Sequence, residues 1–169
     1  YILVTQGDSK FNTLEEFVED SKQNPKFAAT AGLGTTTHFA MERFIAESGA
    51  NFDVVHFRGG GPAVVAILSG EADIYGSSVS SAGGNIASGK VKVLAVLGNE
   101  RIAALPDVPS TKELGYPETE IHQWVGVFAP GGTDADIVAK INADINEVLR
   151  NEEFIATVTP LDWTLEQST

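Results

Sequence analysis

The chain has 169 residues, 43% of them hydrophobic, and a mean hydropathy near zero. This composition suits a globular chain with a sizeable buried core. The 11 lysine and arginine residues are outnumbered by 23 aspartate and glutamate residues, so the formal net charge is −12. Such a charge repels phosphate backbones and anionic lipid surfaces, which argues against nucleic acid as a partner. The absence of cysteine excludes disulfides and thiol catalysis.

Every apolar run is broken within a few residues by glycine, serine or a charged residue. None is long enough to span a bilayer, so we expect no direct membrane insertion. The chain opens as Tyr1-Ile2-Leu3-Val4, without the basic and apolar segments of a signal peptide. Such a start is compatible with a signal peptide that has been removed.

The first part of the chain alternates strand-like and helix-like segments. Strands are predicted at residues 1–5, 27–31, 53–57, 72–75 and 91–97. Helices are predicted from the capping box of Thr13 and Glu16 toward residue 23, through the segment closed by Ser48-Gly49, and from Pro62 to Gly70. This alternation predicts an α/β fold with a largely parallel sheet.

Beyond Gly98 the pattern changes to a proline-rich segment with a second capping box at Ser110 and Glu113. A further strand is predicted at residues 124–129. The next helix has one apolar face, made of Ile137, Val138, Ile141, Ile145, Val148 and Leu149. After Asn151 the pattern weakens, and no closing element is predicted.

A loop rich in glycine and hydroxyl groups, residues 31–38 (Ala-Gly-Leu-Gly-Thr-Thr-Thr-His), joins a predicted strand to a predicted helix. The first N–H groups of a helix have no intrahelical partner, and glycine lets a ligand approach the backbone. Threonine hydroxyls add further donors. The loop therefore predicts a site for a small anion.

Known motifs for catalysis and for cofactor binding match this sequence less well than the anion-binding interpretation of the loop does. The loop lacks the third glycine of a dinucleotide fingerprint, and His38, His56 and His122 show no metal-binding spacing. The Gly59-Gly60-Gly61 run either lines a ligand or only makes a turn. Serines at 77, 78, 80 and 81 follow a strand, where α/β sheets place ligands, but no nucleophile elbow accompanies them. A hydrolytic enzyme using this serine-rich loop and a sensor or interaction domain remain as alternatives.

Six ordered motifs carry a resemblance to a known family. They are residues 56–63 (His-Phe-Arg-Gly-Gly-Gly-Pro-Ala), 70–73 (Gly-Glu-Ala-Asp), 88–96 (Ser-Gly-Lys-Val-Lys-Val-Leu-Ala-Val), 105–110 (Leu-Pro-Asp-Val-Pro-Ser), 124–133 (Trp-Val-Gly-Val-Phe-Ala-Pro-Gly-Gly-Thr) and 141–146 (Ile-Asn-Ala-Asp-Ile-Asn). In order and approximate spacing the chain resembles the tripartite tricarboxylate transporter substrate-binding proteins of the Bug or TctC type. The likeness covers nearly the whole chain.

The resemblance implies a periplasmic-binding-protein-like fold of type II, in which two α/β lobes close on a ligand. By that likeness residues 1–7 form a hinge strand and residues 8–97 the second lobe with the ligand loop. Residues 98–169 form a return segment that packs in the first lobe. That lobe is expected to be incomplete here, because family members begin with a further segment that carries another carboxylate-binding loop.

The resemblance also implies a function. It predicts an exported, periplasmic receptor that captures a small carboxylate and delivers it to the membrane subunits of a tripartite tricarboxylate transporter, without catalysis, metal or cofactor. The predicted ligand-binding residues are Gly34, Thr35, Thr36, Thr37, His38, Gly60, Ser77 and Ser78. Within this set His38 supports the loop from the helix side. Ser77 stands where the family often has an acid, which favours a plain carboxylate over an amino acid.

Overall fold

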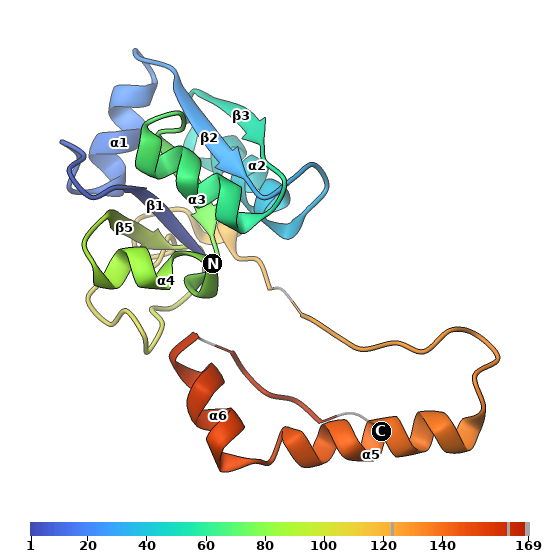
Figure 1. Cartoon of the computed structure of the whole chain (residues 1–169). Coiled ribbons are helices and arrows are strands. Elements are labelled where there is room, and N and C mark those ends of the chain that lie inside the picture. The colour runs from blue at the N-terminus through green and yellow to red at the C-terminus, as the bar shows by residue number, and fades with distance from the viewer. Residues whose placement is uncertain (123, 162, 168–169) are drawn as a thin grey trace. The chain divides into compact units, whose positions relative to one another are not determined.

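The computed structural model describes residues 1–122, 124–161 and 163–167. The chain divides into two compact units, residues 1–122 and residues 123–169. The strands of the first unit are β1 (Ile2–Gln6), β2 (Lys26–Thr30), β3 (Phe52–His56), β4 (Ile74–Ser77) and β5 (Val91–Val96). They form one sheet in the order β3-β2-β4-β1-β5 (Figure 1).

The direction of β1 sets the topology of this sheet. Strand β2 pairs in parallel with β3 and β4, whereas β1 pairs antiparallel with β4 and β5. Within the described sheet, β1 therefore runs against the other four strands. The largely parallel α/β sheet predicted from the sequence is confirmed.

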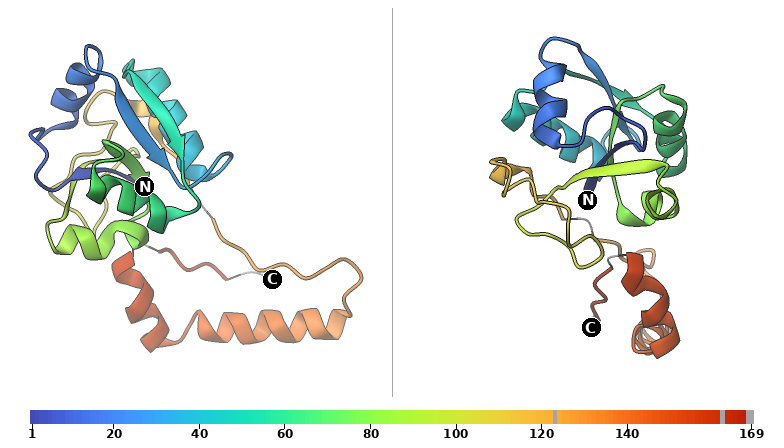
Figure 2. Two further views of the ribbon diagram at one scale, coloured as in Figure 1. Left: turned by 45° about the horizontal axis from the view of Figure 1, so that its top comes forward. Right: turned by 90° about the vertical axis from the view of Figure 1, so that its left-hand side faces the viewer.

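Helices cover both faces of the sheet, as the right-hand view of Figure 2 shows. The first two, α1 (Leu14–Ser21) and α2 (Thr36–Ser48), pack on one face in a core that includes Leu3. The next two, α3 (Gly60–Ser69) and α4 (Val79–Ala87), pack on the opposite face against Ile2 and Val4. Ile2, Leu3 and Val4 thus enter opposite cores in turn and are all fully buried, as in a sheet covered on both sides.

Local capping chemistry fixes the helix ends where the sequence predicts them. The hydroxyl of Thr13 accepts the Glu16 N–H at 3.2 Å, and the Glu16 carboxylate accepts the Thr13 N–H at 3.4 Å. Gly49 and Gly70 end α2 and α3 with φ angles of 65° and 76°, in the left-handed region where glycine is favoured.

Helix α4 was not predicted, because its serines and glycines have low helix propensity. It forms because the Ser78 hydroxyl caps it, accepting the Ser81 N–H at 3.2 Å, while Val79 and Ala82 are buried against the sheet. Strand β4 also begins later than the predicted residue 72. The Asp73 N–H donates to the Phe27 carbonyl at 2.8 Å, but it is the Asp73 carboxylate that accepts the Phe27 N–H, also at 2.8 Å, so the regular register with β2 begins at Ile74 opposite Ala28.

The second predicted capping box exists without a helix. The Ser110 hydroxyl accepts the Glu113 N–H at 3.2 Å and the Glu113 carboxylate accepts the Ser110 N–H at 2.8 Å. The following residues make only turns, which Gly115 ends with a φ of 91°, and a short 3₁₀ turn, η1 (Pro117–Thr119), comes next. The Tyr116 ring packs edge-on against Phe44 of α2, which ties this segment to the first unit.

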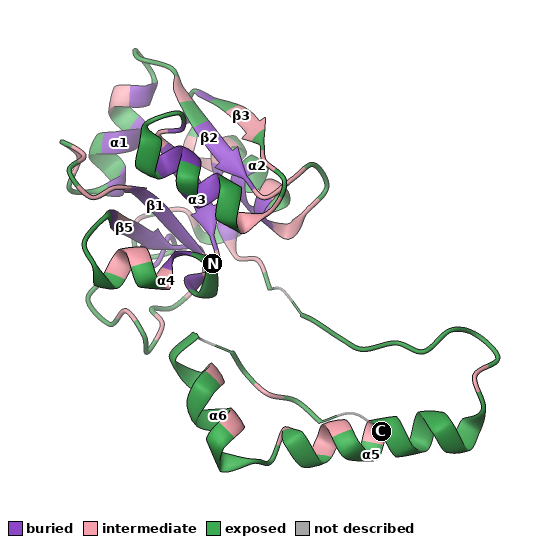
Figure 3. Ribbon diagram, in the orientation of Figure 1, coloured by how far each residue is buried: buried purple, intermediate pink, exposed green. Residues whose placement is uncertain are grey.

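The second unit contains α5 (Ala135–Val148), α6 (Glu152–Val158) and a 3₁₀ turn, η2 (Thr159–Leu161). Helix α5 forms as predicted, but none of its described residues is buried (Figure 3). Helix α6, which was not predicted, begins at the Asn151 side chain, which accepts the Phe154 N–H at 3.0 Å.

The predicted strand at residues 124–129 is wrong for this structure. These residues are extended and exposed, with Trp124 at 73% and Phe128 at 77%. A strand needs a neighbouring strand to satisfy its backbone, and none pairs with this segment among the described residues.

The first unit extends to His122, so it includes part of the predicted return segment 98–169. The assignment of residues 1–7 to a hinge, 8–97 to one lobe and 98–169 to another stays a prediction. In the part of the chain that the structure describes, no helix has both the length and the hydrophobicity needed to cross a membrane.

We expect Thr13→Ala to lower the free energy of unfolding by about 1 kcal/mol, because it removes the hydroxyl that caps α1. Thr13→Ser keeps that hydroxyl and is the matched control. Urea unfolding followed by circular dichroism measures both. Equal midpoints for Thr13→Ala and the wild type would contradict the capping role.

Candidate functional site

The predicted binding residues meet at one edge of the sheet. Strands β3, β2 and β4 are neighbours and run in the same direction, so their carboxyl ends lie together, and α2, α3 and α4 begin there. Ligands of open α/β sheets bind at this edge. The first turn of α2 also lies close to β4. A Cβ added to Gly76 of β4 would lie 3.7 Å from the Thr37 carbonyl oxygen.

Two threonine hydroxyls build the loop between β2 and α2. Thr35 is the N-cap of α2, and its hydroxyl donates to the Gly32 carbonyl at 2.7 Å. The Thr37 hydroxyl accepts the Ala31 N–H at 2.8 Å and lies 2.9 Å from the Thr35 hydroxyl. Because the single Thr35 proton is directed to Gly32, Thr37 is the donor in that pair. Both protons are therefore committed within the loop.

Backbone N–H groups and the Thr36 hydroxyl are further candidate donors at this loop. Thr36 and Thr37 are the first two residues of α2, where N–H groups have no intrahelical partner. Gly34 precedes them with a φ of 74°, a conformation that favours glycine, and a Cβ there would meet no atom within 4 Å. The N-terminus of α2 thus supplies N–H groups without an intrahelical partner and a helix dipole that favours an anion.

His38 supports the loop from inside the first turn of α2. Its Nδ1 accepts the Gly34 N–H at 3.1 Å, so this nitrogen is unprotonated. Its Nε2 lies 3.4 Å from a Glu42 carboxylate oxygen. The His38 ring also meets the His56 ring edge-on, with centroids 4.5 Å apart, and His56 Nδ1 lies 2.7 Å from the Thr30 hydroxyl.

Gly60 is the first residue of α3, and its lack of a side chain allows a close approach between elements. A Cβ at this position would lie 2.7 Å from the Ser81 hydroxyl oxygen and 3.2 Å from the Tyr75 phenol oxygen. The first contact is too short for real atoms, so a side chain here would require the Ser81 side chain or α3 itself to shift. A direct ligand contact by Gly60 stays a prediction.

The serines at the end of β4 cap α4. Ser77 is fully buried, and its hydroxyl donates to the Ser78 carbonyl at 2.9 Å. The Ser78 hydroxyl lies 3.0 Å from that of Ser80 and donates to that of Ser81 at 2.9 Å. These contacts are those of a helix cap rather than of a nucleophile with its base. Whether Ser77 or Ser78 contacts a ligand stays a prediction.

Sequence reasoning missed two tyrosines at this edge. Tyr75 of β4 is 1% exposed, and burial raises its pKa to about 12 although its hydrogen bond with Ser77 opposes that shift. Tyr1 is half-buried, is hydrogen-bonded to the Thr36 side chain, and has a pKa raised by burial. Tyr1 reaches the edge because β1 runs antiparallel, which no local sequence signal reveals.

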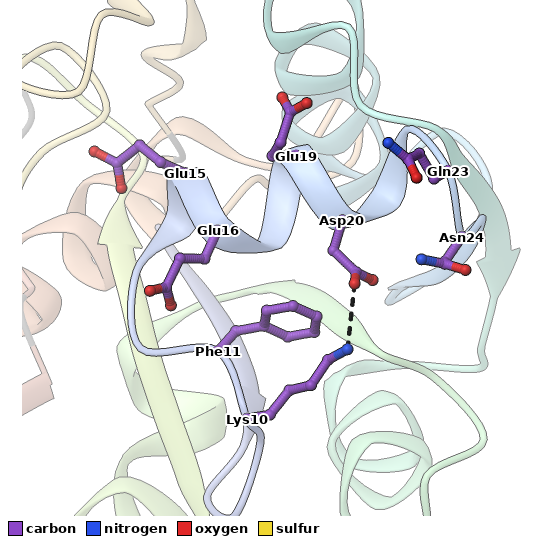
Figure 4. A pocket seen from close by; sticks show the side chains of 8 residues that line it. All are labelled: Lys10, Phe11, Glu15, Glu16, Glu19, Asp20, Gln23 and Asn24. Carbon is purple, nitrogen blue, oxygen red and sulfur yellow. Dashed lines mark hydrogen bonds and ion pairs between the residues drawn. The ribbon is translucent and has the colours of Figure 1, made fainter.

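A surface depression of about 680 Å³ lies away from this edge, along α1 (Figure 4). Its lining residues are Lys10, Phe11, Glu15, Glu16, Glu19, Asp20, Gln23 and Asn24. Lys10 and Lys26 pair with Asp20 at 3.2 and 2.7 Å, and Lys26 is the main cause of the lowered pKa of Asp20. The remaining carboxylates make the depression unsuitable for an anion.

In the described ranges no group of three or more His, Cys, Asp or Glu side chains is placed to hold a metal ion.

Comparison with known proteins places this geometry in context. A family model described as "Tripartite tricarboxylate transporter family receptor" matches residues 1–165. A UPF0065 protein of a Pseudomonas species is 35% identical over 165 residues, which cover 95% of this chain and 48% of that protein. BugT of Bordetella pertussis is 34% identical over 156 residues, which cover 91% of this chain and 48% of BugT. The chain thus spans about half the length of the curated relatives that it matches.

A solved structure of MatC from Rhodopseudomonas palustris with bound malate superposes with a TM-score of 0.87 at 29% identity. The match covers 95% of this chain and 55% of MatC. The predicted periplasmic-binding-protein-like fold is thereby confirmed. The matched proteins are receptors and binding proteins rather than enzymes.

Alkaline pH is expected to destabilise the fold through Tyr75. Its pKa is about 12 in the folded chain and 10.0 ordinarily, so the unfolded chain releases the proton first. The stability that depends on the neutral phenol is complete below pH 10 and is lost toward pH 12. We expect Tyr75→Phe to remove roughly 2 kcal/mol of this decline, as measured by urea unfolding across the pH range. If the free energy of unfolding of Tyr75→Phe falls between pH 10 and 12 as much as that of the wild type, Tyr75 is not the group responsible.

Proposed function

The chain belongs to the tripartite tricarboxylate transporter receptor family, and from this premise we propose that its first unit binds a carboxylate of a small organic acid. The site is the N-terminus of α2 at the carboxyl edge of the sheet. The observation that carries the proposal is the start of α2, where the N–H groups of Thr36 and Thr37 have no intrahelical partner and Gly34 leaves open space beside them. The bound malate of MatC supports the same ligand class.

The predicted site binds its anion with neutral groups. None of the eight predicted binding residues is lysine or arginine. Backbone N–H groups and the helix dipole act within the first turn of the helix. The net charge of −12 repels a small anion from a distance, but salt screens that repulsion beyond about 8 Å. Local donors therefore decide affinity, and the chain's charge slows only the approach.

For the whole protein we propose an exported, periplasmic receptor that delivers its ligand to the membrane subunits of a tripartite tricarboxylate transporter. The family name supports this role. A second lobe closing over the α2 loop would exclude water and add contacts to the other end of the ligand. Since this chain spans about half of its relatives, its own affinity is expected to be weaker than that of the full-length protein.

The hydrolytic alternative has less support. The hydroxyls of Ser78, Ser80 and Ser81 are bonded to one another at the start of α4. A serine nucleophile needs a histidine or another base within hydrogen-bond reach. Incubating the protein with candidate esters and assaying for product tests this alternative directly.

We expect the full-length protein to be stabilised by one or a few mono- or dicarboxylates in a thermal-shift screen that also contains amino acids and aromatic acids. Isothermal titration then measures the dissociation constant of each hit. The chain of residues 1–169 is titrated in parallel and is expected to bind the same acid more weakly. A full-length protein that binds none of the acids would overturn the proposed function.

Substitutions in the loop should weaken binding in two distinguishable ways. Thr35→Ala removes the N-cap of α2, so both the affinity and the melting temperature should fall. Thr36→Val keeps the shape of the side chain and removes only a hydroxyl, so the affinity should fall about fivefold with little change in melting temperature. Ser69→Ala, at the opposite end of α3, is the control. Unchanged dissociation constants for both loop variants would count against this site.

A further inference from the structure

Arg58 is the only charged residue in the loops that precede α2, α3 and α4 at the carboxyl edge of the sheet. These loops are residues 31–35, residues 57–59 and Ser78. The Arg58 side chain is exposed, and among the described residues it has no ion pair or hydrogen bond. Six other basic side chains pair with acids: Lys10, Lys22, Lys26, Arg43, Arg101 and Lys140. Arg58 therefore keeps an unpaired positive charge at this edge.

Two backbone hydrogen bonds fix the position of Arg58 beside the proposed carboxylate loop. The Phe57 N–H donates to the Thr30 carbonyl at 2.9 Å, and the Gly59 N–H donates to the Ala31 carbonyl at 2.9 Å. Thr30 ends β2 and Ala31 begins the loop that leads into α2. Both chain neighbours of Arg58 are thus bonded to the segment that carries the proposed site, so the charge is held next to it.

Acidic residues are absent from the first turns of the three helices that begin at this edge. Helices α2, α3 and α4 have none there, whereas α1, α5 and α6 each begin with at least one aspartate or glutamate. An acid in the first turn stabilises a helix through the helix dipole. In a chain with 23 acidic residues, three helices at one edge lack this contribution. No carboxylate in these first turns therefore repels an incoming anion or offsets the charge of Arg58.

We propose that Arg58 captures the anionic ligand, because its charge raises the rate at which a carboxylate reaches the α2 loop. The inference rests on the proposed function and deepens it. The net charge of −12 slows the approach of an anion, whereas a local positive charge attracts it within the screening length of about 8 Å. An exposed charge of this kind acts mainly on association and less on the lifetime of the complex. Backbone N–H groups at the start of α2 then hold the carboxylate.

The test measures binding kinetics in the full-length protein. The ligand is the acid that stabilises the wild type most in the thermal-shift screen, and stopped-flow fluorescence gives the association and dissociation rate constants. Arg58→Gln is expected to lower the association rate constant about threefold at about 10 mM salt, with a smaller change in dissociation. At about 500 mM salt the difference from the wild type should disappear, because salt screens the charge.

Three further variants separate the local charge from other effects. Arg58→Lys keeps the charge and should retain the association rate constant of the wild type, whereas Arg58→Glu reverses the charge and should lower it further than Arg58→Gln does. Lys90→Gln is the matched control, because Lys90 is also exposed but precedes β5, at the opposite edge of the sheet. It changes the net charge by the same amount and should leave the association rate constant almost unchanged.

The outcomes distinguish the inference from the proposed function. If the wild type binds no acid, both fail. If the wild type binds and Arg58→Gln associates equally fast at low salt, only capture by Arg58 is overturned. A change confined to dissociation, an equal loss in Lys90→Gln, or a loss that Arg58→Lys does not restore also overturns it. A loss in Arg58→Gln at low salt that Arg58→Lys restores supports the inference.

Discussion

The antiparallel pairing of β1 with both β4 and β5 is the constraint on which the rest of the first unit depends. This strand joins β5 to the other strands of the sheet, and Ile2, Leu3 and Val4 bury their side chains in alternate cores. Burial of such side chains contributes roughly 1.5–3 kcal/mol each. Its reversed direction also places Tyr1 beside the carboxyl ends of the parallel strands.

The position of the candidate site follows from the order and direction of the strands. Three neighbouring strands end at one edge, and each is followed by a helix whose first N–H groups have no intrahelical partner. The hydroxyls of Thr35 and Thr37 hold the α2 loop in shape, and His38 accepts the N–H of Gly34. A strongly acidic chain thus presents a local donor surface made of neutral groups, which suits an anion without requiring a basic patch.

Elements with strong local signals could be predicted from the sequence. The capping box at Thr13 and the glycines after α2 and α3 determine helix ends through adjacent atoms, so they needed no tertiary information. Helix α4 has weak propensity and forms through its cap and its packing on the sheet. Residues 124–129 have a strand-like pattern, yet a strand requires a partner, and sequence alone does not supply one.

By itself the sequence determined the α/β alternation, the helix caps, the glycine and threonine loop and the family resemblance, because each depends on residues close together in the chain or on ordered motifs. Only the tertiary structure decided the direction of β1 and the order of the strands. Those features depend on pairing between segments far apart in the chain, such as Ile2 with Ser77 and Val96. They bring Tyr1 to Thr36 and make Gly60 a packing contact, since hydrogen bonding and steric fit act only between atoms that the fold has placed together.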